Sequence, residues 1–560
     1  MPNRGLAARV AGAVLIVTLF AADAACAERP QDELVIGISQ FPANFNPAIN
    51  TMASKSYILN MAHRPVTAYD ADWQQICVLC TELPSLENGR AVYETTADGK
   101  PGIAVTYTLK PGLRWGDGTP VTTRDVLFTW EVGRHPKSGV AGAEAFRRIV
   151  AIDVADERTY TVHVDKRSCE FAGAGGFDLL PAHLDGPVFA ADPVAYRNRS
   201  TFETDTTNPG LWFGPYRIAA VAPGSHVVLE RNPTWTGPEP YFRRIVVKTF
   251  ENTASMMSNL LSGGIDYIAG EIGLTLDQAQ AFEGRVGDRF RFLYKPVLTY
   301  EHIDVNLDNP ILADRRVRRA LAYGANRTAI SERLFGGHQP VAASNVNPLD
   351  RNYDPNVPQY PYDPERARAL LAEAGWHDIR NGVRHNVEGQ PLRIELMTTA
   401  GNKTRETVEQ VLQSDWRRIG IDVRIRNEPA RVFFGSTMTM RTFSGLVMYA
   451  WLSSPGSLPR GQLHSAEIPT AENGWSGQNY PSYRNPEMDR LAEDVETVCE
   501  PAENQRLWSA VQRLYAEDLP VIPLYFRADP HIMPKWLAGV RPTGHLVPST
   551  MWVEQWRRAP

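Results

Sequence analysis

Alternating apolar and polar positions predict strands at several places along the chain. Residues 34–38 form a short, continuous apolar run, which predicts a buried strand near the N-terminus. Val105, Tyr107 and Leu109 alternate with polar residues, the pattern of a strand with one buried face. Similar patterns predict further strands at 160–164, 214–218, 227–231, 300–306, 421–425 and 520–526. Strands are therefore expected along the whole chain.

Apolar residues at helical spacing predict helices between these strands. Thr122, followed three residues later by Asp125, forms a capping-box-like start for a helix that runs through Trp130. Val317 and Leu321 share one face of an arginine-rich helix. We expect the arginines at 315, 316, 318 and 319 to face solvent, with an anion site as the alternative. Further helices are predicted near 57–61, from Asp363 to 371, and at 408–419 and 506–515. The alternation of strands and helices predicts an α/β fold.

The segment 107–130 combines these signals in one unit. Pro111-Gly112 and Gly116-Asp117-Gly118 supply tight turns on either side of a short stretch, and the capped helix follows. This strand-turn-strand-turn-helix unit resembles the signature of family 5 extracellular solute-binding proteins, the oligopeptide and dipeptide receptors of ABC importers. Other motifs resemble the same family in the same order: a strand at 214–218, an Asn232-Pro233 turn, a helix-glycine-strand stretch at 260–266 and the arginine-rich helix.

The resemblance implies a fold and a division into domains. Family members have the two-lobed periplasmic binding protein fold (α/β, type II, cluster C-like), in which two crossover strands join the lobes, and an additional small domain. Carried onto this chain, lobe I comprises 28–65, 205–295 and 525–560. The additional domain comprises 66–204, and lobe II comprises 296–524.

The N-terminus has the pattern of an export signal. Arg4 and Arg9 precede an apolar run at 10–22, and Ala25-Cys26-Ala27 fits a cleavage site, so 1–27 is predicted to be a signal peptide. The run is too short for a membrane span, which needs about 20 residues. A lipid anchor on Cys26 is the less favoured alternative, because Asp23 stands where such a signal has an apolar residue. These features predict a periplasmic protein.

Composition and charge narrow the function classes. Of the 560 residues, 43% are hydrophobic and 22% charged, which is enough for a large core. The formal charge of -5 and the lack of a basic run disfavour nucleic acid as a partner. The sequence lacks G-x-S-x-G, H-E-x-x-H, P-loop and Rossmann motifs, and its histidines are scattered. We therefore expect no enzymatic activity, no cofactor and no metal site, and a monomer.

Four cysteines remain after the predicted cleavage: Cys77, Cys80, Cys169 and Cys499. In an oxidising compartment they allow three disulfide connectivities, of which a local bridge between Cys77 and Cys80 is the simplest. Free thiols are the alternative. A zinc site is disfavoured because the chain has no second C-x-x-C.

The resemblance places a key part of the ligand pocket on a lobe II strand at 445–451, with Tyr449 and Trp451 as candidate ligand contacts. Peptide receptors often have a carboxylate three residues after this Trp, where it pairs with the ligand's amino group. This chain has Ser454 there. Either another acid supplies the charge, with Glu467 and Glu472 as nearby candidates, or the ligand has no ammonium group at that point.

The remaining candidates are placed by position. Arg441 and Arg460 flank the strand and are candidates to face a carboxylate or phosphate, with a surface charge as the alternative for each. The candidate ligand-binding residues are Phe41, Asn44, Arg441, Tyr449, Trp451, Ser454, Trp475, Asn479 and Tyr525.

The sequence therefore predicts an extracytoplasmic receptor that captures a peptide or peptide-like solute and delivers it to the membrane permease of an ABC importer. A non-peptide solute, such as a sugar, opine, metal chelate or haem, is the alternative within this class. An exported hydrolase or a chaperone-like interaction protein is the alternative from another class.

Overall fold

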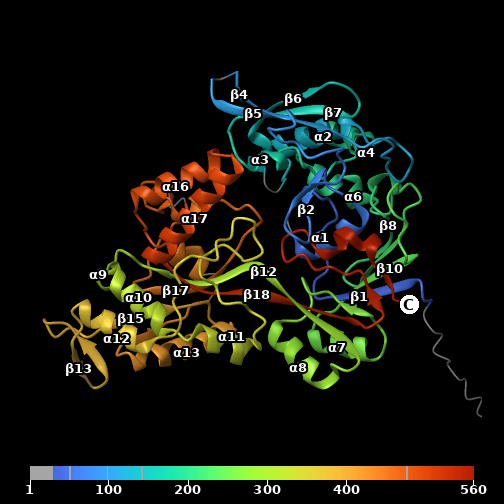
Figure 1. The fold of residues 1–560 in the computed structure, drawn as a ribbon. Helices are drawn as coiled ribbons and strands as arrows, with labels where there is room; N and C mark the ends of the chain where they lie inside the picture. Colours follow the sequence, from blue (N-terminus) through green and yellow to red (C-terminus); the bar gives the residue numbers. More distant parts are fainter. Residues whose placement is uncertain are drawn as a thin grey trace, which may run out of the picture.

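One ten-stranded mixed sheet runs through the molecule (Figure 1). The computed structural model describes residues 30–559 except 50–51, 98, 141–142, 430–431 and 474–476, so the predicted signal peptide and Trp475 lie outside the described residues. Across the sheet the order is β16 (Asp422–Ile425), β15 (Arg393–Met397), β17 (Leu446–Leu452), β12 (Phe290–Val305), β18 (Val521–Pro534), β11 (Tyr267–Ile268), β1 (Glu33–Ile38), β10 (Arg244–Thr249), β9 (His226–Arg231) and β8 (Tyr216–Ala222).

The two long central strands, β12 and β18, join the two halves of this sheet. They pair antiparallel with each other along most of their length, and the pairing shifts register between Pro296 and Tyr300 and again after Glu301. On one side β12 pairs with β17, and on the other β18 pairs with β11. Each half of the sheet carries its own helices and core. This is the expected two-lobed fold with two crossover strands.

The helices cover the two halves of the sheet separately. In the half that contains β1, Leu34 and Ile36 belong to a core that also includes Tyr57 and Trp212. In the half that contains β15, Leu321 and Leu371 share a core with Trp416. The first half has α1 (Ala53–Ala62), α7 (Thr253–Leu261) and α8 (Leu276–Val286). The second has α9 (Pro310–Ala313), α10 (Arg315–Gly324), α11 (Arg327–Phe335), α12 (Pro364–Glu373), α13 (Lys403–Arg418), α15 (Arg460–Leu463), α16 (Pro486–Thr497) and α17 (Pro501–Asp518).

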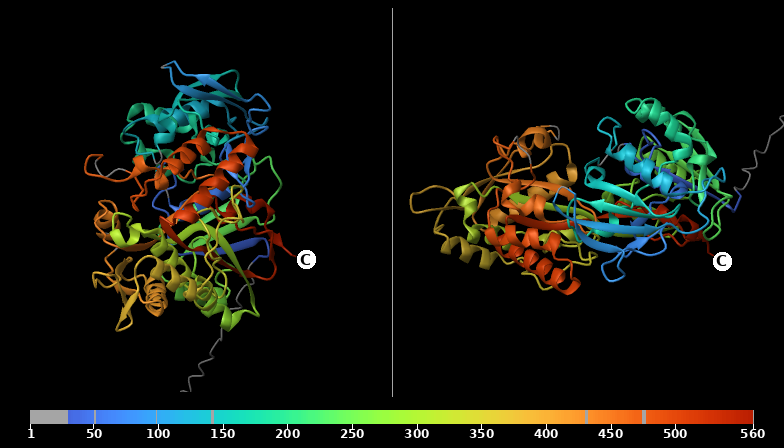
Figure 2. Two further views of the ribbon diagram at one scale, coloured as in Figure 1. Left: turned by 60° about the vertical axis from the view of Figure 1, so that its left-hand side comes forward. Right: turned by 90° about the horizontal axis from the view of Figure 1, so that it is seen from above.

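The range 66–204 contains a separate four-stranded sheet, which lies at the opposite end of the molecule from α12 and α13 (Figure 2). Its strands are β4 (Ala91–Thr95), β5 (Pro101–Thr108), β7 (Thr159–Val164) and β6 (Ile149–Val154). Its helices are α2 (Thr123–Arg134), α3 (Ala143–Arg147), α4 (Ala182–Ala191), α5 (Tyr196–Arg199) and α6 (Thr201–Thr204). The same range contains a two-stranded pair, β2 (Thr67–Tyr69) with β3 (Gln75–Cys77). A second pair, β13 (Asp378–Arg380) with β14 (Val383–His385), lies outside it. The last two, β19 (Leu537–Ala538) and β20 (Arg557–Arg558), form a third pair.

The strand and the capped helix predicted within 107–130 are confirmed, whereas the short stretch between the two turns forms only an isolated bridge between Arg114 and Pro120. Val105, Tyr107 and Leu109 are all fully buried, so the period-2 pattern marks the buried face of this strand. Thr122 and Asp125 form the predicted capping box at the start of α2. Between them and the strand the chain turns at Gly118, whose φ of 91° is a conformation that favours glycine.

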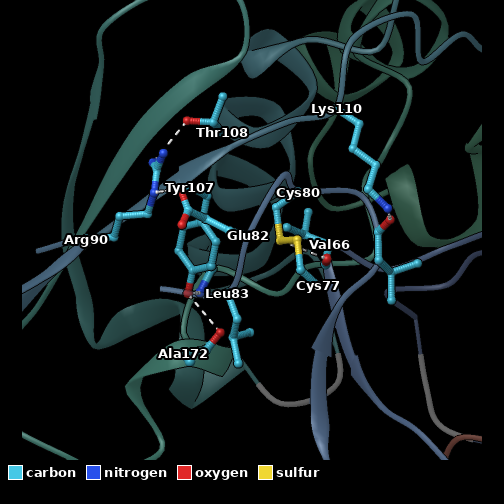
Figure 3. Close-up of a disulfide and its surroundings, with 12 residues drawn as sticks. Val66, Cys77, Cys80, Glu82, Leu83, Arg90, Tyr107, Thr108, Lys110 and Ala172 are labelled. Carbon is cyan, nitrogen blue, oxygen red and sulfur yellow. Dashed lines mark hydrogen bonds and ion pairs between the residues drawn. A yellow bond between two sulfur atoms is a disulfide. The ribbon is translucent and has the colours of Figure 1, made fainter. Parts of the chain in front are cut away.

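Two disulfides lie within the described residues. Cys77 bonds to Cys80 beside β5, where the Tyr107 hydroxyl donates to the Ala172 carbonyl at 3.1 Å (Figure 3). The second disulfide joins Cys169 to Cys499, 330 residues later, and so connects the range 66–204 to the segment between α16 and α17. The first is a local staple, whereas the second ties together parts of the chain that are far apart in sequence.

The expectation that all four arginines of α10 face solvent was wrong for Arg318, which is buried. Its guanidinium donates to the carbonyls of Asp518, at 2.6 and 2.9 Å, and Leu312, at 2.8 Å. Asp518 is the last residue of α17, where backbone carbonyls lack helical partners and a cation is favoured. Arg318 therefore caps a helix that lies 200 residues away in the sequence.

A buried carboxyl on α13 gives the stability of this half of the molecule a pH dependence. Glu409 is fully buried, and Asn427 donates to its Oε2 at 2.7 Å while Oε1 has no partner within the described structure. Burial raises the pKa of Glu409 to about 7. The folded state therefore holds a proton that the unfolded carboxyl releases near pH 4.5, so the cost of burying the charge grows as the pH rises from there through 7.

We expect Glu409→Gln to raise the free energy of unfolding by about 1–3 kcal/mol at about pH 8.5, because glutamine keeps the bond to Asn427 without the charge. At about pH 5 the gain should nearly disappear. Urea denaturation at both pH values measures this, with exposed Glu388→Gln as the control. A gain of equal size at both pH values would contradict the assignment.

Candidate functional site

β17 carries the predicted ligand residues from the core to the surface. It pairs antiparallel with β12, so that Tyr449 lies opposite His302 and Trp451 opposite Tyr300. The first four residues of β17 are buried, Trp451 is half-buried and Leu452 is 62% exposed. Trp451 therefore lies where the strand leaves the core, beside the two crossover strands.

A buried polar network fixes this strand. The Tyr449 hydroxyl donates to Asp304 at 2.7 Å, and the His302 ring lies 3.4 Å from the same carboxylate. Burial raises the pKa of Tyr449 well above its ordinary value, so its phenol stays protonated and keeps donating to Asp304. The Tyr449 hydroxyl is thus committed to the protein, and the residue orients its neighbour Trp451.

A cavity of about 40 Å³ adjoins Trp451, and we refer to it as the Trp451 cavity. Its wall combines hydrophobic and aromatic side chains with hydroxyl, amide and carboxyl groups: Leu298, Asn345, Asp350, Trp451, Ser453, Ser454, Ser457 and Trp508, among others. A volume of this size holds about three water molecules. It therefore fits a small terminal group of a ligand, and the rest of a peptide would lie outside it.

Residues from the range 66–204 stand against the rim of this cavity. The Tyr69 hydroxyl donates to Glu170 Oε2 at 2.9 Å, and Arg351 Nη2 lies 2.5 Å from Glu170 Oε1. A Cβ at Gly456, in the turn after β17, would stand only 2.7 Å from the Glu170 carboxyl carbon. Segments that are far apart in the sequence thus meet in close contact beside the Trp451 cavity.

The structure brings together three of the predicted site residues: Tyr449 and Trp451, whose rings lie 6.4 Å apart, and Ser454, which lines the same cavity as Trp451. The carboxylate in the cavity wall is Asp350, which sequence reasoning missed. Glu467 instead lies 3.6 Å from Arg460, and Glu472 is exposed on a loop. The loop that contains Asp350 carries no motif that marks it.

Three other candidates have their side chains occupied within the protein. Arg441 donates to the Tyr480 carbonyl at 2.9 Å and pairs with Asp308 at 2.5 Å. Asn479 is fully buried, and its amide group bonds to backbone atoms of His464 and Tyr483. We therefore leave Arg441 and Asn479 out of the proposed site. Tyr525 is omitted as well, because its ring is buried and packs 4.9 Å from Phe335.

Phe41 and Asn44 follow β1 and lie outside the Trp451 cavity. The Phe41 ring packs against Phe45 at 6.2 Å, and Asn44 accepts a hydrogen bond from Lys55 at 3.4 Å. Both stay predictions as ligand contacts.

Roomier hollows exist, and they differ in character from this cavity. One of about 910 Å³ is an open groove beside the edge strand β16, lined by four arginines and other polar side chains together with Ile421, Val423 and Ile425, and separated from β12 in the sheet by β15 and β17. Another hollow, of about 280 Å³, is lined by Arg351, Cys169 and Cys499, among other residues. If volume alone identified the ligand site, the groove of about 910 Å³ would be chosen. We favour the Trp451 cavity because a ligand site combines apolar walls with a few convergent polar groups.

Comparisons with known proteins agree with this architecture. Residues 91–465 match the family model of bacterial extracellular solute-binding proteins, family 5. The oligopeptide-binding protein AppA of Bacillus subtilis is 24% identical over 525 residues, covering 92% of this chain and 90% of its own length. Among the described residues, no helix combines the length and hydrophobicity that a membrane crossing requires.

Solved structures extend the comparison. The oligopeptide-binding protein of Thermus thermophilus, complexed with a pentapeptide, is 29% identical, with a TM-score of 0.67 and coverage of 94% of this chain and 96% of its own. NikZ from Campylobacter jejuni, in complex with Ni(L-His), is 22% identical, with a TM-score of 0.68 and coverage of 95% and 100%. Fold, site and comparisons define a two-lobed binding protein. The chain belongs to family 5 of the bacterial extracellular solute-binding proteins.

Proposed function

We propose that this protein is the extracytoplasmic receptor of an ABC importer, which captures a peptide or peptide-like solute between its two lobes and delivers it to the membrane permease unchanged. The observation that carries the proposal is the Trp451 cavity, whose wall includes Leu298 and Tyr300 of the crossover strand β12 and beside which Glu170 of the range 66–204 pairs with Arg351. Closure of two lobes on a ligand is the usual motion of such receptors. We further propose that the protein reaches the periplasm through a cleaved signal peptide and acts as a monomer.

The relatives support a peptide as the ligand. The similar protein from Thermus thermophilus holds a pentapeptide, and AppA of Bacillus subtilis is named for oligopeptide binding. A non-peptide solute is the second candidate, because a protein of the same fold holds Ni(L-His) and because Ser454 stands in place of the usual carboxylate. Native mass spectrometry of protein taken from the periplasm distinguishes the two by the mass of the copurified solute. Turnover of a panel of hydrolase substrates would instead favour an enzyme.

We expect Trp451→Ala to weaken ligand binding about 10-fold to 100-fold, because a half-buried indole in a ligand cavity supplies apolar contact area. Binding is measured by tryptophan fluorescence and equilibrium dialysis with pooled tripeptides. Trp235→Ala, whose ring lies over Arg64 outside the cavity, is the control. Equal affinity of Trp451→Ala and wild type would remove Trp451 from the site.

A further inference from the structure

We propose that the Trp451 cavity receives a primary ammonium group of the ligand, and that Asp350 is the carboxylate that pairs with it. The proposal rests on the proposed receptor function and adds the chemical group that the receptor selects.

The charges around the cavity favour a cation. Asp350 is the charged residue in its wall, and none of the described wall residues is a lysine, arginine or histidine. The Asp350 carboxylate accepts a hydrogen bond from the backbone N–H of Asn352 at 2.9 Å and another from the backbone N–H of Gly456. Within the described residues no cation lies within ion-pair distance of it. A desolvated carboxylate without a counter-ion is costly, so a ligand cation would be stabilised there.

The nearest cation is committed elsewhere. Arg351 follows Asp350 directly in the chain, yet its guanidinium lies 2.5 Å from the Glu170 carboxylate. Glu170 also accepts a hydrogen bond from the Tyr69 hydroxyl, so Tyr69 and Arg351 together hold the Glu170 carboxylate in place. While Glu170 holds Arg351, the charge of Asp350 remains available to a ligand.

The other polar atoms also suit a donor. Asn345 Oδ1 is a buried acceptor in the cavity wall with no partner among the described residues. Trp451 and Trp508 also line the cavity, and cations are attracted to aromatic rings. An ammonium group carries three N–H donors and no acceptor. It matches a carboxylate, an amide oxygen and aromatic faces, whereas a carboxylate or phosphate would meet the negative charge of Asp350.

The size of the cavity agrees with this assignment. At about 40 Å³ it accommodates an amino group and the first carbon atoms attached to it. Two sources share this chemistry in a peptide: the amino terminus and a lysine side chain. The experiment below separates them.

Binding of three tripeptide pools to the full mature chain tests the proposal. The first pool lacks lysine and has free amino termini, the second is the same pool after acetylation, and the third is acetylated at its amino termini but contains one free lysine. We expect acetylation to weaken binding about 10-fold to 100-fold. Recovery of affinity in the third pool identifies the lysine side chain as a second source of the ammonium. Equal binding of the first two pools would overturn the proposal.

Variants locate the effect. Asp350→Asn should remove the preference for free amino groups, since asparagine keeps an acceptor for the Asn352 amide but has no charge. Glu467→Gln, which changes the nearby acid paired with Arg460, should keep the preference. A preference that survives Asp350→Asn would overturn the role of Asp350. The comparison of pools on the unmodified protein stands even if a variant fails to fold.

A small amine separates this proposal from the proposed function. If none of the pools binds, the peptide assignment fails, and ethylammonium chloride then tests the cavity directly. We expect it to raise the Tm of the wild type more than an equal concentration of sodium chloride does, and to lose this advantage with Asp350→Asn. Equal shifts with the two salts on the wild type would overturn the ammonium site.

Discussion

Replacing Glu301 with alanine is expected to lower the free energy of unfolding by about 3–5 kcal/mol, because it leaves a buried ion cluster without its anion. Glu301 lies on β12 and is 1% exposed. Arg405, on α13, donates to both of its carboxylate oxygens at 3.2 Å. Arg527, on β18, donates through Nε at 2.8 Å and through Nη2 as well. The Glu301 carboxylate therefore links both crossover strands, β12 and β18, to helix α13.

Urea denaturation followed by tryptophan fluorescence measures this effect. Glu301→Gln should cost less than Glu301→Ala, since the amide keeps one acceptor for the arginines. Glu365→Ala is the matched control, because Glu365 pairs with Arg368 at the surface and is 85% exposed, so its loss should cost less than about 1 kcal/mol. A loss below about 1 kcal/mol for Glu301→Ala would show that the cluster does not stabilise the fold.

Local features of this chain could be predicted from the sequence, whereas the ion cluster could not. The buried face of Val105, Tyr107 and Leu109 and the capping box at Thr122 depend on residues a few positions apart. The partners Glu301 and Arg527 are 226 residues apart and meet only through the pairing of β12 with β18. The pattern of charges along the sequence does not show which residues of β12 and β18 lie opposite each other.

The sequence also does not show which distant segments meet in the folded protein, and for this reason Asp350 was not predicted as part of the site. The strand predicted at 300–306 is the second half of β12, which begins at Phe290. The first half was missed, although Phe290, Phe292 and Tyr294 alternate with the more exposed Arg291 and Leu293. The resemblance to the family indicated Trp451, whereas Glu467 and Glu472 were named for the missing acid because they lie near it in the sequence. Asp350 reaches the cavity from a loop about 100 residues earlier in the chain. Only the tertiary fold places it beside Trp451.

The second large effect is expected at the disulfide between Cys169 and Cys499. Replacing both residues with serine should lower the free energy of unfolding by about 2–5 kcal/mol, because the bond closes a long loop and restricts the unfolded chain. Next to it, Lys166 pairs with Glu496, and the Cys169 amide donates to the Glu496 carbonyl at 3.1 Å. These contacts join the same two parts of the chain as the disulfide. Without the covalent bond these parts would depend on noncovalent contacts such as the partly exposed pair of Lys166 with Glu496, and exposed ion pairs contribute little.

The double replacement should also widen the range of opening between these parts in the absence of ligand. The distance between spin labels on exposed positions of α3 and α16 measures this, and it should become longer and more broadly distributed than in the wild type. Removing the Cys77–Cys80 disulfide is the control, because that bond closes a loop within a single part of the molecule and should leave the distance unchanged. If the distance distribution stays the same after the loss of Cys169 and Cys499, then the noncovalent contacts alone hold this side of the molecule, and opening must occur around them.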